Sequence, residues 1–234
     1  MELTPVAVCE NRRLGPGFWL SWERTFAFRP GQVVGLTLSP QQAVRWYSLA
    51  SGNKDPWASV LYTEVEGGEL TPFLAALKPH DTLYVTQPQG MFSFPPRYVG
   101  VATGTGIAPF LSAQKSGLNG PTQLLQGARS QDGLYFAELW REVLGERYLP
   151  CCSREKALGV TFGRVTDLLK RENLAGGEGG LGLGAPAVGP PRAPHFSTTM
   201  PYRLCGSAEM VVEARDVLIE KGVPFQQIVS EVYF

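Results

Sequence analysis

The residue pattern of this 234-residue chain changes at Pro95-Pro96, and this change limits the possible folds more than any other feature. Before it, short runs rich in β-branched and aromatic residues alternate with turns that contain Gly, Pro or Asp. These runs cover residues 4–10, 18–22, 32–38, 46–51, 58–65 and 82–87. Many short strands separated by turn signals are typical of a small antiparallel barrel or sandwich. One short helix is expected at 70–78, with Thr71 as its N-cap and Pro72 at its first helical position.

After the break, apolar runs alternate with segments of helical pattern. Strands are expected at 98–102, 122–127, 147–152, 202–206 and 226–234, and helices at 104–114, 133–144, 163–171 and 207–222. This succession predicts a Rossmann-like parallel sheet with helices on both faces. We therefore expect an antiparallel β-barrel domain over 1–96 and an α/β domain over 97–234.

A segment rich in glycine and proline interrupts the second half. Residues 175–200 hold 7 Gly and 4 Pro and show no apolar face. We interpret the segment as a flexible surface loop inserted between structured elements, with a catalytic lid as the alternative.

Charge and cysteine content exclude several classes of function. The chain has 21 Lys and Arg against 21 Asp and Glu, so it lacks the basic surplus of a nucleic-acid-binding protein. No apolar run approaches the roughly 18 residues that cross a bilayer, and the N-terminus does not resemble a secretory signal. We therefore expect a cytoplasmic protein without membrane partners. The four cysteines and two histidines lack metal-site spacings, so we expect no metal.

The segment Gly104-Thr105-Gly106-Ile107-Ala108-Pro109 follows the first expected strand of the second half and opens a helix. Glycines at such a turn let backbone N–H groups approach a pyrophosphate, which the helix dipole also favours. A tight strand-to-helix turn without a ligand explains the same residues, so the motif alone leaves both interpretations open.

Two segments of the first half suit a flat, phosphorylated ligand. Residues 45–48 (Arg-Trp-Tyr-Ser) combine a cation, aromatic rings and a hydroxyl on one strand. Core packing of the two rings beside a solvated Arg45 is the alternative. Residues 67–72 place two glycines and Thr71 at a helix start, which makes either an anion site or simply a capped helix.

Three segments of the second half carry similar signals. Ser153 and Arg154 follow the strand that ends at 152, where Rossmann-like folds bind the adenosine ribose. Arg154 there would select a 2′-phosphate, whereas otherwise Arg154 and Arg164 are ordinary surface charges. The pair at 205–206 (Cys-Gly) allows close approach by a flat ring. The ending at 230–234 joins a carboxylate to two aromatic residues, or is simply a strand held by burial.

Together these segments resemble the ferredoxin–NADP reductase family of flavoenzymes. The residues that carry the resemblance lie at 28–32, 45–48, 104–110, 205–210 and 231–233, in the family's order and spacing. The match spans almost the whole chain except the Gly/Pro-rich insertion. It implies that the barrel domain, 1–96, binds FAD, that the domain at 97–234 binds NADP, and that catalysis occurs between them.

The resemblance also implies roles for individual residues. Tyr47 would pack on the isoalloxazine ring, Arg45 would hold the flavin pyrophosphate, and Ser48 would hydrogen-bond near the reactive flavin nitrogen. The residues that would seat the flavin phosphates are Gly68, Leu70 and Thr71. Those that would bind the NADP pyrophosphate are Thr103, Gly104, Thr105, Gly106 and Pro109. The 2′-phosphate would be bound by Ser153, Arg154 and Arg164.

Catalysis would involve Ser48, Cys205, Glu231 and Tyr233, with Cys205 and Glu231 flanking the nicotinamide. A terminal aromatic ring would cover the flavin. We favour Tyr233 for this, while Phe234 extends over the flavin or packs elsewhere.

The function implied is electron exchange between NADP(H) and a small one-electron carrier, ferredoxin or flavodoxin, by hydride transfer between nicotinamide and FAD. Such chemistry depends on the alignment of two rings and needs no strong acid or base, which suits a chain with two histidines. Two alternatives are kept: a reductase component of an oxygenase or a free flavin reductase, and a non-catalytic flavin or nucleotide sensor. We expect a monomer.

Overall fold

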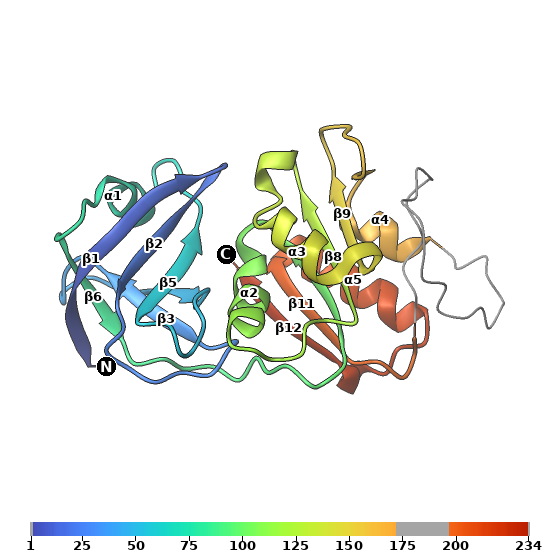
Figure 1. The fold of residues 1–234 in the computed structure, drawn as a ribbon, viewed down its shortest axis with the longest axis horizontal. Coiled ribbons are helices and arrows are strands. Elements are labelled where there is room, and N and C mark those ends of the chain that lie inside the picture. Colours follow the sequence, from blue (N-terminus) through green and yellow to red (C-terminus); the bar gives the residue numbers. More distant parts are fainter. Residues whose placement is uncertain (1, 172–196, 234) are drawn as a thin grey trace.

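The computed structural model describes residues 2–171 and 197–233, which form two halves lying side by side with the C-terminus between them (Figure 1). Phe234 and most of the insertion expected at 175–200 lie outside the described residues. Among the described helices, none is long and apolar enough to span a membrane.

The first half is a six-stranded antiparallel sheet in the order β4-β3-β6-β1-β2-β5. Its strands are β1 (Leu3–Leu14), β2 (Gly17–Glu23), β3 (Val33–Thr37), β4 (Arg45–Ser48), β5 (Trp57–Tyr62) and β6 (Thr82–Thr86). The edge strands β4 and β5 meet at an isolated bridge between Leu49 and Val60, so the sheet curls into a barrel that is not fully closed. Apolar side chains that alternate along the strands fill its interior, as expected for half-buried strands.

The helix α1 (Thr71–Ala76) covers one end of this barrel (Figure 1). Leu74 belongs to the barrel core, and the Asn11 side-chain amide donates to the carbonyl oxygens of Leu74 at 2.8 Å and Leu77 at 2.9 Å. Thr71 is not the N-cap that the sequence predicts. It is the first helical residue, and its hydroxyl accepts a hydrogen bond from the Val65 N–H at 2.8 Å, because the loop before the helix folds back on it.

The second half is a six-stranded parallel sheet in the order β10-β9-β8-β7-β11-β12. Its strands are β7 (Val99–Thr103), β8 (Gln123–Ala128), β9 (Tyr148–Cys152), β10 (Thr161–Phe162), β11 (Tyr202–Ser207) and β12 (Ile228–Tyr233). Helices α2 (Ala108–Lys115) and α3 (Ala137–Leu144) pack on one face, and α4 (Val165–Lys170) and α5 (Ala208–Glu220) on the other. The predicted fold class, an antiparallel barrel joined to a Rossmann-like sheet, is confirmed.

All strands of this sheet run parallel, but the side on which the chain adds new strands changes at β7, which we call the strand reversal. From β7 the chain adds β8, β9 and β10 on one side, and then returns to add β11 and β12 on the other. Open α/β sheets bind ligands at the carboxyl ends of the strands beside such a reversal. The short 3₁₀ turn Gly104–Ile107 after β7 and the start of α5 after β11 occupy this position.

The helix predicted at 133–144 is shorter than expected, because it begins only at Ala137. A 3₁₀ turn covers Gln131–Gly133, and Phe136 adopts a left-handed backbone conformation with φ of 59°. The Phe136 ring packs against Trp19 of β2, with ring centroids 5.7 Å apart. A contact with the barrel therefore determines where this helix begins.

The two halves touch closely elsewhere. The turn between β1 and β2 lies against the 131–133 segment, where a Cβ at Gly15 would come within 2.1 Å of the Asp132 carbonyl oxygen. The Ser112 hydroxyl of α2 donates to the Ser51 carbonyl at 2.7 Å. These contacts bring the end of β4 next to the carboxyl ends of β11 and β12.

Candidate functional site

A cleft of about 800 Å³ runs along the carboxyl ends of the parallel strands. Pro16 and Thr63 of the barrel contribute to one wall, and loops that follow β7, β8 and β9 form most of the rest. Tyr233, near the end of β12, lies where the cleft reaches the barrel. The cleft is therefore formed by both halves at the strand reversal.

The four residues predicted to be catalytic meet at this end of the cleft. The parallel register pairs Cys205 of β11 with Glu231 of β12, and the barrel presents Ser48 from the end of β4. The Tyr233 hydroxyl donates to Ser48 Oγ at 2.5 Å, and Ser48 Oγ donates to the Glu231 carboxylate. The Cys205 thiol lies beside the Tyr233 hydroxyl. The structure thus brings all four side chains together: Ser48, Glu231 and Tyr233 form a hydrogen-bonded group, and Cys205 lies beside Tyr233.

Burial determines how this group ionises. Desolvation raises the pKa of Glu231, while the hydrogen bond from Ser48 opposes the shift. Desolvation also holds the pKa of the Cys205 thiol and of the Tyr233 hydroxyl well above their ordinary values. A thiol that stays protonated is a poor nucleophile. The Cys205 thiol is therefore suited to packing against a flat ring rather than to covalent catalysis.

The residues expected to hold the flavin lie on the barrel side. Tyr47 is half-buried and meets Tyr62 edge-on, with centroids 6.3 Å apart, and burial raises its pKa to about 12. The Arg45 guanidinium makes an ion pair with Glu69 at 2.7 Å, and its side chain is 56% exposed. This charge beside the loop before α1 fits a diphosphate that replaces the Glu69 carboxylate.

The loop before α1 has room for phosphate groups. Gly67 has φ of 70°, and a Cβ built there would meet nothing within 4 Å. A Cβ at Gly68 would come within 2.9 Å of the Val65 carbonyl oxygen, so a side chain there would distort the loop. The Leu70 side chain is buried in the barrel core and Thr71 holds the loop closed. Because the Leu70 side chain is buried, we expect the backbone groups of Leu70 and Thr71 to face a flavin.

The glycine turn after β7 faces the cleft only in part. Thr103, Gly104 and Thr105 line the cleft, and a Cβ at Gly104 would point into open space. The Thr103 hydroxyl is buried against Gly206 and has no hydrogen-bond partner among the described residues.

Two other residues predicted for the pyrophosphate lie away from the cleft. Gly106 backs onto β11, where a Cβ would come within 2.2 Å of the Cys205 carbonyl oxygen. Pro109 is buried in the first turn of α2. Both shape the turn rather than line the ligand space.

The far end of the cleft is basic. Ser153, Arg154 and Arg164, which the sequence analysis assigned to the 2′-phosphate, line it, and Arg129, which the sequence analysis missed, lines it too. Arg129 follows the end of β8 as Arg154 follows the end of β9, and the Arg154 N–H donates to the Arg129 carbonyl at 2.9 Å. In the sequence, the signal for Arg129 is only that it follows a strand closely: it comes directly after β8, and Arg154 comes two residues after β9. Three guanidinium groups around one cleft suit a phosphate ester.

Comparison with known proteins gives a consistent picture. The chain is 32% identical to a ferredoxin–NADP reductase B of Sorangium cellulosum over 92% of this chain and 90% of that one. It is 30% identical to a flavodoxin/ferredoxin–NADP reductase of Escherichia coli over 79% of this chain and 76% of that one. It also matches the ferredoxin–NAD(P)(+) reductase component of the naphthalene 1,2-dioxygenase system of Pseudomonas putida, at 30% identity over 70% of this chain and 55% of that longer protein.

The fold has close counterparts among solved structures. A ferredoxin NADP+ reductase from Neisseria gonorrhoeae with bound FAD and NADP superposes with a TM-score of 0.79, at 19% identity over 100% of both chains. No protein-family model matches the chain.

Proposed function

Because this chain belongs to the ferredoxin–NADP reductase family, we propose that it is an FAD-dependent oxidoreductase that exchanges electrons between NADP(H) and a ferredoxin-type carrier. The observation that carries the proposal is the hydrogen-bonded group of Ser48, Glu231 and Tyr233, with Cys205 beside it, at the junction of barrel and sheet. We assign FAD to the barrel, 1–96, and NADP(H) to 97–234.

The chain's own residues align the reactants. FAD, when bound, supplies the ring that takes up a hydride and passes electrons on singly. Arg45 and the loop before α1 would hold its diphosphate, and Tyr47 would pack against its ring. Arg129, Arg154 and Arg164 would hold the 2′-phosphate of NADP(H), and the turn after β7 its pyrophosphate. Such positioning accounts for much of the rate of a reaction between two bound rings.

The hydrogen-bonded group serves the reacting end. Ser48 Oγ donates its one proton to the Glu231 carboxylate, so it would have to leave that carboxylate to donate to a flavin. Cys205 stays a neutral thiol that lets a flat ring approach β11. The Tyr233 hydroxyl contacts both Ser48 and Cys205, so a nicotinamide ring that reaches Cys205 must displace the tyrosine. Binding of nicotinamide and movement of Tyr233 are therefore coupled.

The finer assignments are proposals as well. Flavodoxin is a second carrier of the same kind. A monomer is supported because one chain supplies every residue of the site, and the balance of 21 basic and 21 acidic residues favours no nucleic-acid partner.

A cytoplasmic location is also part of the proposal. The four cysteines are all free thiols, which agrees with the reducing conditions of a cytoplasm. We do not retain the sensor alternative, because the four side chains that hydride transfer would use are in contact.

The test is spectroscopic and kinetic. The purified protein should carry the absorbance of oxidised flavin and lose it on addition of NADPH. Reduction of cytochrome c should accelerate when ferredoxin or flavodoxin is added. A folded protein that refuses added FAD would overturn the proposal.

The second candidate is the reductase component of an oxygenase, which the similarity to the naphthalene dioxygenase reductase component supports. Acceleration by the ferredoxin of an oxygenase system, but not by other ferredoxins or flavodoxins, would favour this candidate. A free flavin reductase would instead reduce added FMN or FAD faster than any carrier.

A further inference from the structure

Two acidic residues of α5, Glu209 and Glu213, line the nucleotide cleft beside its cations. Glu209, in the first turn of α5, lines the cleft together with Arg129, Arg154 and Arg164. Its carboxylate makes an ion pair with the Arg164 guanidinium, with 2.6 Å between Nη1 and Oε1. One of the three guanidinium groups thus already has a counter-ion.

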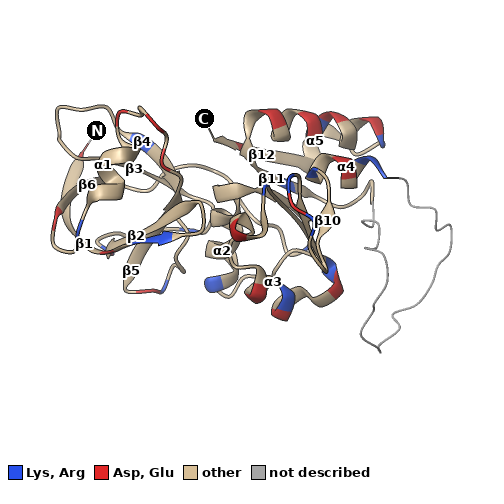
Figure 2. Cartoon of the chain, turned by 90° about the horizontal axis from the view of Figure 1, so that it is seen from above, with Lys and Arg blue, Asp and Glu red and all other residues tan. Residues whose placement is uncertain are grey.

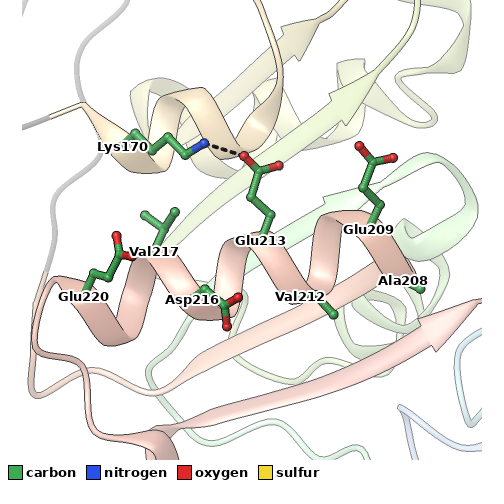
Figure 3. A pocket seen from close by; sticks show the side chains of 8 residues that line it. All are labelled: Lys170, Ala208, Glu209, Val212, Glu213, Asp216, Val217 and Glu220. Atoms are coloured by element: carbon green, nitrogen blue, oxygen red, sulfur yellow. Dashed lines mark hydrogen bonds and ion pairs between the residues drawn. The ribbon is translucent and has the colours of Figure 1, made fainter.

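This pair is part of a contact between two helices. Acidic residues recur along α5, and the end of α4 beside it is basic (Figure 2). Glu209 and Glu213 project from the same side of α5, and Lys170 of α4 reaches Glu213 (Figure 3). Arg164 is the residue that precedes α4. The arrangement fixes Arg164 against α5 before any nucleotide arrives.

We propose that Glu209 is a specificity-determining residue, which lowers the preference for NADPH over NADH by holding Arg164. This inference rests on the proposed function, because it assigns the basic end of the cleft to the 2′-phosphate. Glu209 would lower the affinity for the 2′-phosphate, whereas the three arginines would raise it.

The physical reason is competition for one guanidinium. A 2′-phosphate must either draw Arg164 away from Glu209 or bind beside a pair whose charges cancel. In both cases Arg164 contributes less than a free cation would. The side chains of Arg164 and Glu209 are 60% and 73% exposed, and such exposed pairs are weak. Glu209 therefore reduces phosphate binding without preventing it.

NADH does not meet this opposition. Its adenosine ribose carries a neutral 2′-hydroxyl, and a carboxylate is the group that commonly accepts a hydrogen bond from that hydroxyl in Rossmann-type sites. The presence of Glu209 therefore disfavours only the phosphorylated coenzyme.

The test measures binding of two nucleotide fragments to the flavin-loaded enzyme by calorimetry. We expect Glu209→Gln to bind 2′-phospho-AMP about threefold to fivefold more tightly than the wild type, the upper range for an exposed ion pair, with AMP affinity changed less than about twofold. Glu220→Gln, at the last residue of α5 and outside the cleft, is the matched control and should change neither affinity.

A second comparison tests the route through Arg164. In an Arg164→Ala background, Glu209→Gln should lose most of its effect on 2′-phospho-AMP. An equal change for both fragments, no change for either, or the full effect without Arg164 would each overturn the inference. If the wild type reduces carriers with NADPH while Glu209→Gln changes nothing, only this inference fails. If the wild type binds neither fragment, the proposed nucleotide site fails with it.

Discussion

Removing the Ser48 hydroxyl should destabilise the protein by an amount that grows with pH. Ser48 is 2% exposed, and its hydroxyl accepts from Tyr233 and donates to the Glu231 carboxylate. Ser48→Ala leaves both partners in place without this hydroxyl. A hydrogen bond between neutral groups contributes about 0.5–1.5 kcal/mol, and one to a charged group about 1.5–3 kcal/mol. The cost should therefore be about 1–1.5 kcal/mol greater when Glu231 is ionised.

The direction of the pH effect follows from Glu231. Burial holds its pKa above the ordinary 4.5, and loss of the Ser48 hydrogen bond, which lowers that pKa, raises it further. A carboxyl with a raised folded pKa stabilises the fold at low pH and loses that contribution as pH rises through the folded pKa. In the variant the folded pKa of Glu231 is higher, so more stability is lost as pH rises and the loss continues to a higher pH. The cost of Ser48→Ala therefore grows across the range between the two folded pKa values.

Urea unfolding of the flavin-free protein at pH 5 and pH 8, followed by tryptophan fluorescence, measures this cost. Ser51→Ala is the matched control. Ser51 is also 2% exposed, and its hydroxyl accepts from the Ser59 N–H at 3.1 Å, with no ionisable partner. Its cost should be the same at both pH values. A cost of Ser48→Ala that is equal at both values, or larger at pH 5, would refute the reasoning.

Three further substitutions test the nucleotide site. Arg154→Ala should weaken use of NADPH by about 1.5–3 kcal/mol and leave NADH nearly unaffected in steady-state kinetics, and an equal loss for both coenzymes would contradict a 2′-phosphate contact. Gly104→Ala adds a methyl group in the open cleft at φ of 53°, so titration should show weaker NADP+ binding, with about 1–2 kcal/mol of backbone strain. Unchanged affinity would exclude this turn as a phosphate site. Gly106→Ala tests the packing of the turn beside that site, because it places a methyl group 2.2 Å from the Cys205 carbonyl oxygen. Thermal melting should show a loss of stability at or above the usual overpacking range of about 1–3 kcal/mol. A wild-type Tm would contradict that contact.

Most strands and helices could be predicted because their signals are local. Runs of β-branched residues between turns, and the change to helical spacing after Pro95-Pro96, are properties of neighbouring residues. The prediction failed where distant packing decides. Phe136 is held in a left-handed conformation against Trp19 of the barrel, and nothing near it in the sequence indicates this. The strand β10 has only two residues and exists because Thr161 pairs with Cys151.

Less of the site could be predicted from patterns of neighbouring residues. Ser48 and Glu231 are 183 positions apart, so only the family resemblance could place them together. Arg129 and Glu209 were missed because a single charged residue after a strand, or at a helix start, is usually a surface charge. That both residues line one cleft is visible only in three dimensions. The roles of the individual site residues stay predictions until the variants above are measured.

The turn between β1 and β2 has a practical consequence for building chimeras. A methyl group at Gly15 would overlap the main chain of Asp132, so this turn and the 131–133 segment have complementary shapes with no slack between them. A barrel transplanted from a relative would need to bring the matching 131–133 segment with it. Crossover points chosen only at the linker near Pro95 would separate surfaces that have to be inherited together.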